Sequence, residues 1–294
     1  ASSMAVGYIT LLSLDEQLRV TQQTLKSRED AFNLAKRQFE TGYTSRLELM
    51  QADSELRSTR AQIPPLRHQI AQQENALSLL LGANPGAVKR NAFAQLSPLS
   101  LPSQLPSTLL NRRPDIVQAQ RQLVAADATL ASSQAQLLPS INLTGSLQDR
   151  TLPDLLDNPL RLWSLGGSIL APLLNRQALN AQVDVSMAQR NQALYSYEKT
   201  VRGALKEVND SLDAIGRYGE QLSELQAQEK VAQETLRIAQ NRYRNGYSSY
   251  LDVLDAQRTL FSTQLSVVQV KNNLLLAQVD LYRSLGGGWS DSSG

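Results

Sequence analysis

Few residues in this sequence are of the types that carry out chemistry. The 294 residues include no Cys and a single histidine, His68. The lack of Cys excludes disulfides, thiolate zinc sites and Cys nucleophiles, and one histidine is too few for a His-rich metal site. His68 lies in a helical pattern beside Arg67, with no acidic partner at ligand spacing. We find no acid–base pair, nucleophile constellation or metal set, so the sequence predicts no enzyme activity, no cofactor and no metal site.

Two carboxylates have a spacing that suggests a physical role instead of catalysis. Asp252 and Asp255 are three residues apart, so they share one face of a helix close to a predicted turn. In a symmetric assembly of several copies they would form stacked carboxylate rings, which favour cations and oppose anions. The alternative is that Asp252 only caps its helix and that Asp255 is solvated.

The elements that must position these aspartates occur twice. Residues 37–56 (RQFETGYTSRLELMQADSEL) match residues 241–260 (NRYRNGYSSYLDVLDAQRTL) at an offset of 204, from 37 to 241. The same offset holds without a gap across 14–82 and 218–286, which chance does not explain. We therefore predict two structural repeats.

The repeats predict the organisation of the chain. Residues 1–82 read as the second half of repeat 1, a helix–turn–helix, and residues 114–289 as the whole of repeat 2. A Pro- and Ser-rich connector, 83–113, joins them, and 290–294 form a tail. Repeat 2 has far more residues ahead of its matching part than repeat 1 has, so we expect an N-terminally truncated product.

The helices are predicted to be long and to pair as coiled coils. No proline follows Pro172, and the pattern stays helical from Asn175 to Asn245, a rod of roughly 105 Å at about 1.5 Å per residue. Its apolar residues follow heptad spacing. The helix after the turn at 245–249 carries two apolar seams, so we expect it to pack neighbours on both sides, as a stave does in a cylinder. Gly42 and Gly246 are suited to the left-handed residue that closes a helix.

The segment 141–170 changes from helical to period-2 spacing. Apolar and small polar residues alternate over 141–149 and 162–170, which predicts two strands joined as a hairpin. Each strand has the length that crosses a bilayer when tilted, and its open edges would need other strands, because unpaired edges cannot lie in lipid. A soluble hairpin packed on the helices is the alternative. The predicted lipid-facing residues are Ile141, Leu143, Leu147, Trp163, Leu165 and Ile169.

Charge and hydropathy exclude two further classes. Lys and Arg number 29 and Asp and Glu 27, a formal net charge of +2, whereas a nucleic-acid binder carries a basic stripe. The sequence has no apolar window of about 18 residues, so it predicts no transmembrane helix.

Four segments together resemble the TolC-type outer-membrane efflux protein family, in its NodT-like branch associated with resistance-nodulation-division pumps. They are Asn111–Pro139 (NRRPDIVQAQRQLVAADATLASSQAQLLP), Ser140–Gly145 (SINLTG), Asn241–Leu260 and Ser284–Trp289 (SLGGGW). The resemblance covers essentially the whole chain. It implies a mainly α fold of very long coiled-coil helices, the staves of an α-barrel, with one transmembrane β-hairpin and a small equatorial region.

The resemblance also implies partners and a location. Family members are homotrimers in the bacterial outer membrane, in contact with its lipid, and their helical part lies in the periplasm. Each protomer gives two hairpins to a membrane barrel, of which this sequence carries one. The helix–turn–helix tips form the periplasmic entrance and dock on an adaptor (membrane fusion) protein coupled to an inner-membrane resistance-nodulation-division pump. The implied function is a passive exit duct for drugs or other small solutes.

The family's entrance residues carry over where they match. The tip tyrosine corresponds to Tyr243 and the aspartates of the constriction to Asp252 and Asp255, while Glu48 occupies the related place in repeat 1, where it is also suited to cap a helix. An arginine that pairs across the tip in some relatives is replaced by Ser248. The turn residues implied to meet the adaptor are Thr41, Gly42, Tyr43, Asn245, Gly246 and Tyr247.

Two other functions stay open at this point. The first is a soluble coiled-coil scaffold, which would have no use for a membrane hairpin. The second is a duct of the same fold that serves type I secretion or metal-cation efflux, which the tip sequence does not separate from drug efflux. The pump partner would decide between these ducts.

Overall fold

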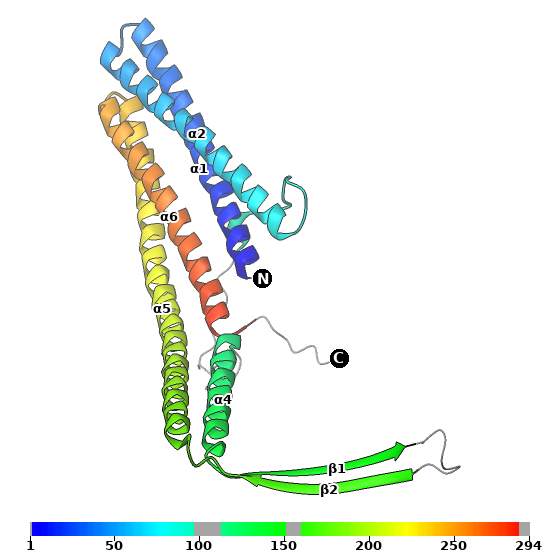
Figure 1. Cartoon of the computed structure of the whole chain (residues 1–294). Helices are drawn as coiled ribbons and strands as arrows, with labels where there is room; N and C mark the ends of the chain where they lie inside the picture. The colour runs from blue at the N-terminus through cyan, green and yellow to red at the C-terminus, as the bar shows by residue number, and fades with distance from the viewer. Residues whose placement is uncertain (1, 97–112, 151–159, 288–294) are drawn as a thin grey trace. The chain divides into compact units, whose positions relative to one another are not determined.

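The computed structural model describes residues 2–96, 113–150 and 160–287. In these residues it confirms the mainly helical fold with one hairpin (Figure 1). The helices and strands are α1 (Ser2–Glu40), α2 (Arg46–Leu80), the short 3-10 helix η1 (Phe93–Gln95), α4 (Pro114–Ala135), β1 (Ser140–Arg150), β2 (Leu160–Leu170), α5 (Arg176–Arg244) and α6 (Tyr250–Ser284).

The chain divides into two compact units. Unit 1 comprises Ala1–Pro106 and Lys206–Gly294, and unit 2 comprises Ser107–Leu205. Helix α5 contributes its first part to unit 2 and its remainder to unit 1. This division follows spatial contacts and does not test the repeat boundaries, which stay a prediction.

Helix α6 holds unit 1 together through two apolar seams, as its sequence predicts. One seam faces α1 and η1, and the other faces α5. The first cluster contains Leu12, Val20, Phe93, Phe261, Val268 and Leu275. The second contains Val208, Ile215, Leu274, Ala277 and Leu281.

Four glycines end the helices of unit 1 in the left-handed conformation. Their φ angles are 77° at Gly42, 67° at Gly82, 75° at Gly246 and 70° at Gly286. A side chain with a Cβ is strained in this conformation, whereas glycine is not. The four form two pairs separated by the repeat offset of 204 residues, so the two sequence repeats end their helices in the same way.

Unit 2 pairs α4 with the first part of α5 and carries the hairpin. The hydroxyls of Ser133 and Ser186 share a buried hydrogen bond of 2.8 Å, and Arg190 donates from Nε to Oδ1 of Asp127 at 2.8 Å. The sequence pattern stays helical from Pro114 to about Leu138, just before Pro139, but helix α4 ends at Ala135. The strands β1 and β2 pair antiparallel with Ser140 opposite Leu170 and Arg150 opposite Leu160.

The described part of the chain contains no helix with the length and apolar character needed to cross a membrane.

Candidate functional site

The turn that joins α1 to α2 and the turn that joins α5 to α6 have the same pattern of hydrogen bonds. In the first turn the amide of Gly42 donates to the carbonyl of Phe39 at 3.0 Å, and the amide of Tyr43 donates to that of Gln38 at 2.7 Å. This pair of bonds is the Schellman motif, which satisfies the last free carbonyls of a helix. The second turn has the same bonds from Gly246 to Tyr243 (3.0 Å) and from Tyr247 to Arg242 (2.8 Å).

The six predicted docking residues lie in these two turns, and all are exposed. Two of their side chains bond back to the helix that they follow: the Thr41 hydroxyl donates to the carbonyl of Arg37, and the Asn245 amide to that of Asn241. Gly42 and Gly246 have no side chain to offer. The rings of Tyr43 and Tyr247, which are 89% and 77% exposed, are therefore the large side chains that project from the two turns into solvent.

Tyr243, the predicted tip tyrosine, connects α5 to α1. Its hydroxyl donates to Oε1 of Gln38 at 2.7 Å, and its ring packs at a tilt against Tyr250, with centroids 5.6 Å apart. Burial, with a contribution from nearby Glu48, raises the pKa of Tyr243. Burial also raises the pKa of Tyr250 to about 12. Both phenols therefore stay protonated at neutral pH, and Tyr243 keeps its proton to donate.

Asp252 and Asp255 lie on the exposed side of α6, while Val253, Leu254 and Ala256 are buried. The Asp255 carboxylate lies 3.7 Å from Nη1 of Arg258. The structure thus brings the two aspartates to one face of one helix, as predicted. Their role in a constriction needs further copies of the chain and stays a prediction.

Glu48 takes part in capping α2. Its amide donates to Oγ of Ser45 at 3.3 Å, and its carboxylate accepts a hydrogen bond from the Thr44 hydroxyl. Ser45 is therefore the N-cap of α2, whereas Ser249 starts α6 without a side-chain capping bond.

A charge network that the sequence does not predict joins three helices, with a buried pair, Arg28 and Glu55, at its centre. Nη1 of Arg28 on α1 lies 2.8 Å from Oε2 of Glu55 on α2. The two side chains are only 5% and 13% exposed. Arg28 also donates to the Glu55 carbonyl at 3.0 Å and to the Thr59 hydroxyl. Arg258 of α6 donates from Nε to Oε1 of Glu55 at 3.0 Å. The network connects α6 to the α1–α2 pair. On α6, Arg258 also lies close to Asp255.

The hairpin presents one apolar face and one face that carries polar side chains together with Leu162 and Leu170. The register places Ile141 opposite Ile169 and Leu147 opposite Trp163, and facing residues of an antiparallel pair lie on the same side. On the other side the hydroxyls of Ser146 and Ser164 share a hydrogen bond of 2.9 Å. The six predicted lipid-facing side chains are 69–77% exposed: Ile141, Leu143, Leu147, Trp163, Leu165 and Ile169.

The hairpin has no further strand to pair with in the described residues, since its sheet has two strands. Its outer edges therefore carry backbone groups that a neighbouring strand can satisfy. The described part of the chain also has no group of three His, Cys, Asp or Glu side chains that could hold a metal ion.

Comparison with known proteins places these features in a family. The family model described as "Outer membrane efflux protein" matches residues 1–83 and 105–287. The chain is 35% identical over 298 residues to the probable efflux pump outer membrane protein TtgC of Pseudomonas putida, covering 100% of this chain and 61% of TtgC. It is 33% identical over 292 residues to the probable outer membrane lipoprotein SilC of Salmonella typhimurium, covering 98% of this chain and 63% of SilC.

The fold is similar to a solved structure as well. The outer membrane protein VceC of Vibrio cholerae superposes with a TM-score of 0.84 and 26% sequence identity, covering 98% of this chain and 70% of VceC. The chain spans 61% to 63% of the length of the two curated relatives that it matches.

Proposed function

Since the chain belongs to the outer membrane efflux protein family, we propose that it forms part of the passive exit duct of a tripartite efflux system in the bacterial outer membrane. Helices α1, α2, α5 and α6 supply wall elements in the periplasm, and the β1–β2 hairpin crosses the membrane. Drugs or other small solutes pass through the duct. The chain performs no chemistry, and the energy comes from an inner-membrane resistance-nodulation-division pump.

The observation that carries this proposal is the hairpin's apolar face. Water-soluble proteins rarely expose a contiguous apolar patch of this kind, and here six large side chains on one face are 69–77% exposed. Contact with lipid removes this apolar surface from water, while the Ser146–Ser164 side faces an aqueous interior. A soluble scaffold gains nothing from such a face, so that alternative is not favoured.

The unpaired edges of the hairpin support a homotrimer. In lipid every backbone donor and acceptor needs a partner, and a two-stranded sheet leaves both outer edges open. Hairpins of neighbouring protomers can supply the missing bonds. The same symmetry turns the exposed pair Asp252 and Asp255 into rings of carboxylates at the periplasmic aperture. Tyr243 lies next to these rings, and Glu48 contributes from the turn between α1 and α2.

The exposed turns support docking of a periplasmic adaptor protein. Tyr43 and Tyr247 each offer a large ring with a polar hydroxyl, the kind of side chain that anchors protein interfaces. Thr41, Gly42, Asn245 and Gly246 shape the backbone around them. The adaptor then couples the duct to the pump.

Charged substitutions on the two faces of the hairpin test the proposal. An arginine near the middle of the membrane on the lipid face costs about 2–4 kcal/mol, so Leu143→Arg and Leu165→Arg should reduce the amount of protein recovered in the outer-membrane fraction. Thr144→Arg and Ser164→Arg add the same charge one residue away on the opposite face and serve as matched controls. The measurement is outer-membrane fractionation followed by immunoblotting. Equal recovery of all four variants would contradict insertion of the hairpin with this face toward lipid.

A further inference from the structure

The apolar face of the hairpin is shorter than the membrane that the hairpin is proposed to cross. Along β1 this face runs from Ile141 to Leu147, and along β2 it runs from Ile169 to Trp163. At about 3.4 Å per residue each run spans about 20 Å. A strand tilt of about 40° reduces the height to about 16 Å, whereas the apolar band of an outer-membrane barrel is about 25 Å tall. The strands therefore lack about 9 Å of apolar surface.

The charged end of the hairpin cannot supply the missing surface. Beyond Leu147 and Trp163 the next residues on the same face are Asp149 and Arg161, which are both of charged types. Tryptophan is enriched where a barrel leaves the hydrocarbon. Trp163 and the charged pair therefore indicate one boundary of the membrane, and the missing apolar surface must lie at the other end.

Three exposed leucines lie at that other end, where the hairpin joins the helices. Leu138 lies just before β1, and Leu173 and Leu174 lie just after β2. We call them the junction leucines. Their side chains are 65%, 77% and 100% exposed. At the same rise and tilt, the chain from Ile169 to Leu173 adds about 10 Å to the apolar height, which matches the missing surface.

The backbone at the junctions is suited to the edge of the hydrocarbon, where polar groups need partners. The amides of Leu137 and Leu138 donate to carbonyls three residues back, at 3.1 and 3.0 Å. Pro139 and Pro172 have no N–H group. These four positions therefore leave no amide donor to be satisfied by lipid.

A positive charge follows the leucines. Arg176 begins α5 two residues after Leu174 and is exposed, and the first turn of α5 has no acidic residue. Arginine side chains at the end of a membrane segment extend to the interface, where anionic lipid head groups attract them. Leucines followed by an arginine thus match acyl chains followed by phosphate groups.

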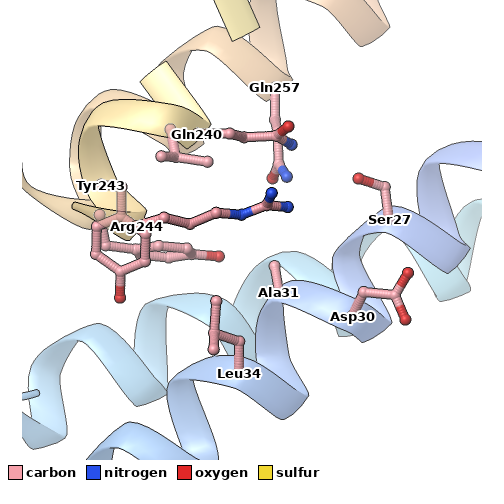
Figure 2. A pocket seen from close by; sticks show the side chains of 10 residues that line it. Ser27, Asp30, Ala31, Leu34, Gln240, Tyr243, Arg244 and Gln257 are labelled. Carbon is pink, nitrogen blue, oxygen red and sulfur yellow. The ribbon is translucent and has the colours of Figure 1, made fainter. Parts of the chain in front are cut away.

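The hollow between α1 and the α5–α6 pair of unit 1 has no comparable surface (Figure 2). Asp30 and Arg244 line it, but both are exposed, so water solvates them. The amide atoms of Gln257 make no hydrogen bond within the described residues, yet they are buried where a ligand in the hollow does not reach them. Exposed leucines differ from exposed charges, because their contact with water is unfavourable.

We propose that Leu138, Leu173 and Leu174 insert into the acyl chains of the periplasm-facing phospholipid leaflet, with Arg176 at the phosphate groups. This inference rests on the proposed function, since it requires the hairpin to cross the membrane. It places the inner boundary of the bilayer at the junction with the helices, beyond the ends of the strands. A second copy of the chain could instead cover the leucines, and the experiment separates the two covers.

Quenching of tryptophan fluorescence by brominated phospholipid tests the proposal, because bromine quenches tryptophans that contact the acyl chains. The native tryptophans are Trp163 and Trp289. Trp289→Phe leaves Trp163 as the reporter of the hairpin. Adding Trp163→Phe and Leu174→Trp moves the reporter to the junction. The full chain is reconstituted into phosphatidylcholine vesicles whose acyl chains are brominated near the head group.

Val124→Trp in the same background is the matched control. Val124 is 62% exposed on α4 of the same unit, about 16 Å before the end of that helix at about 1.5 Å per residue. We expect Leu174→Trp to lose fluorescence to an extent similar to Trp163, and Val124→Trp to keep its fluorescence. Leu138→Trp should respond as Leu174→Trp does. All three replaced side chains are exposed, so the variants should fold normally, which circular dichroism checks.

The reporters separate this inference from the channel function. Quenching of Trp163 without quenching of Leu174→Trp would overturn the inference and leave the proposed function in place. If Leu174→Trp is then unquenched but emits at shorter wavelength than Val124→Trp, a second copy covers the leucines. Equal quenching of Val124→Trp would also overturn the inference, since lipid contact would not be confined to the junction. No quenching of Trp163 would contradict insertion of the hairpin and overturn both.

Discussion

Glu55 is the shared partner of two arginines, and we predict that Glu55→Gln destabilises unit 1 by about 3 kcal/mol. The Arg28 and Glu55 side chains are 5% and 13% exposed, with the charged atoms 2.8 Å apart. Removing one partner of a buried pair leaves the other charge uncompensated and costs about 3–5 kcal/mol. The glutamine oxygen can still accept one bond, which places the estimate at the lower end of that range.

The second arginine contributes much less and serves as the control. The Arg258 side chain is 52% exposed, and exposed ion pairs contribute about 0–1 kcal/mol. Arg258→Met should therefore lower stability by less than about 1 kcal/mol, although it removes a contact to the same carboxylate. Thermal and urea unfolding of the full chain in detergent, followed by circular dichroism of the helices, measures both variants.

A double variant separates the buried pair from its surroundings. Replacing a buried ion pair by apolar side chains of similar volume is often neutral or stabilising, so Arg28→Met with Glu55→Leu should recover most of the stability that Glu55→Gln loses. If Glu55→Gln and Arg258→Met are equally stable, or if the double variant is the least stable, then Arg28 and Glu55 do not form a buried pair in solution.

Three further predictions concern the tips. The pKa of Tyr250 is raised to about 12 in the folded chain, whereas it is about 10 in the unfolded chain. Its contribution to stability is therefore fully present below about pH 10, and up to about 2.7 kcal/mol of it is lost as the pH rises from about 10 to about 12. Tyr250→Phe should reduce this loss of stability at alkaline pH, measured by thermal melts at a series of pH values. Gly42→Ala should cost about 1–2 kcal/mol because φ is +77°, whereas Gly216→Ala, inside α5 with no heavy atom within 4 Å of an added Cβ, should gain about 0.5–1 kcal/mol; thermal midpoints that move in the same direction would refute this. The double variant Asp252→Asn with Asp255→Asn should lower the preference for cations in single-channel currents recorded in planar bilayers. Unchanged reversal potentials in a salt gradient would place these two residues outside the pore.

The sequence alone predicts those features of the fold that depend on residues close to one another along the chain. Alternation between 140 and 170 predicts the hairpin, because the period of a strand is a local property. The same holds for Gly42 and Gly246, since only the residue itself determines how easily it adopts a positive φ. The end of α4 shows the limit: Leu137 and Leu138 bond to carbonyls three residues back, so the last turn tightens and the α-helix ends at Ala135 before the proline is reached.

Contacts between distant residues could not be predicted. Arg28 and Glu55 are 27 residues apart, and Glu55 and Arg258 are 203 apart. The internal repeat gives no help here, because the repeat equivalents of Arg28, Glu55 and Arg258 are Ala232, Thr259 and Ser54, which cannot form the same bonds. The unpaired amide of Gln257 likewise becomes visible only when α1 lies against α6.

The α1–α2 turn and the α5–α6 turn differ in one side-chain hydrogen bond. Glu48 is the repeat equivalent of Asp252, and Thr44 that of Ser248. In the first tip Thr44 donates to the Glu48 carboxylate, so that acid is engaged within its own turn. In the second tip the Ser248 hydroxyl is buried and makes no hydrogen bond among the described residues, and Asp252 remains exposed on the same face as Asp255. Two copies of one turn thus keep the same backbone, while the side-chain hydrogen bond that engages Glu48 in the first copy has no counterpart at Asp252 in the second.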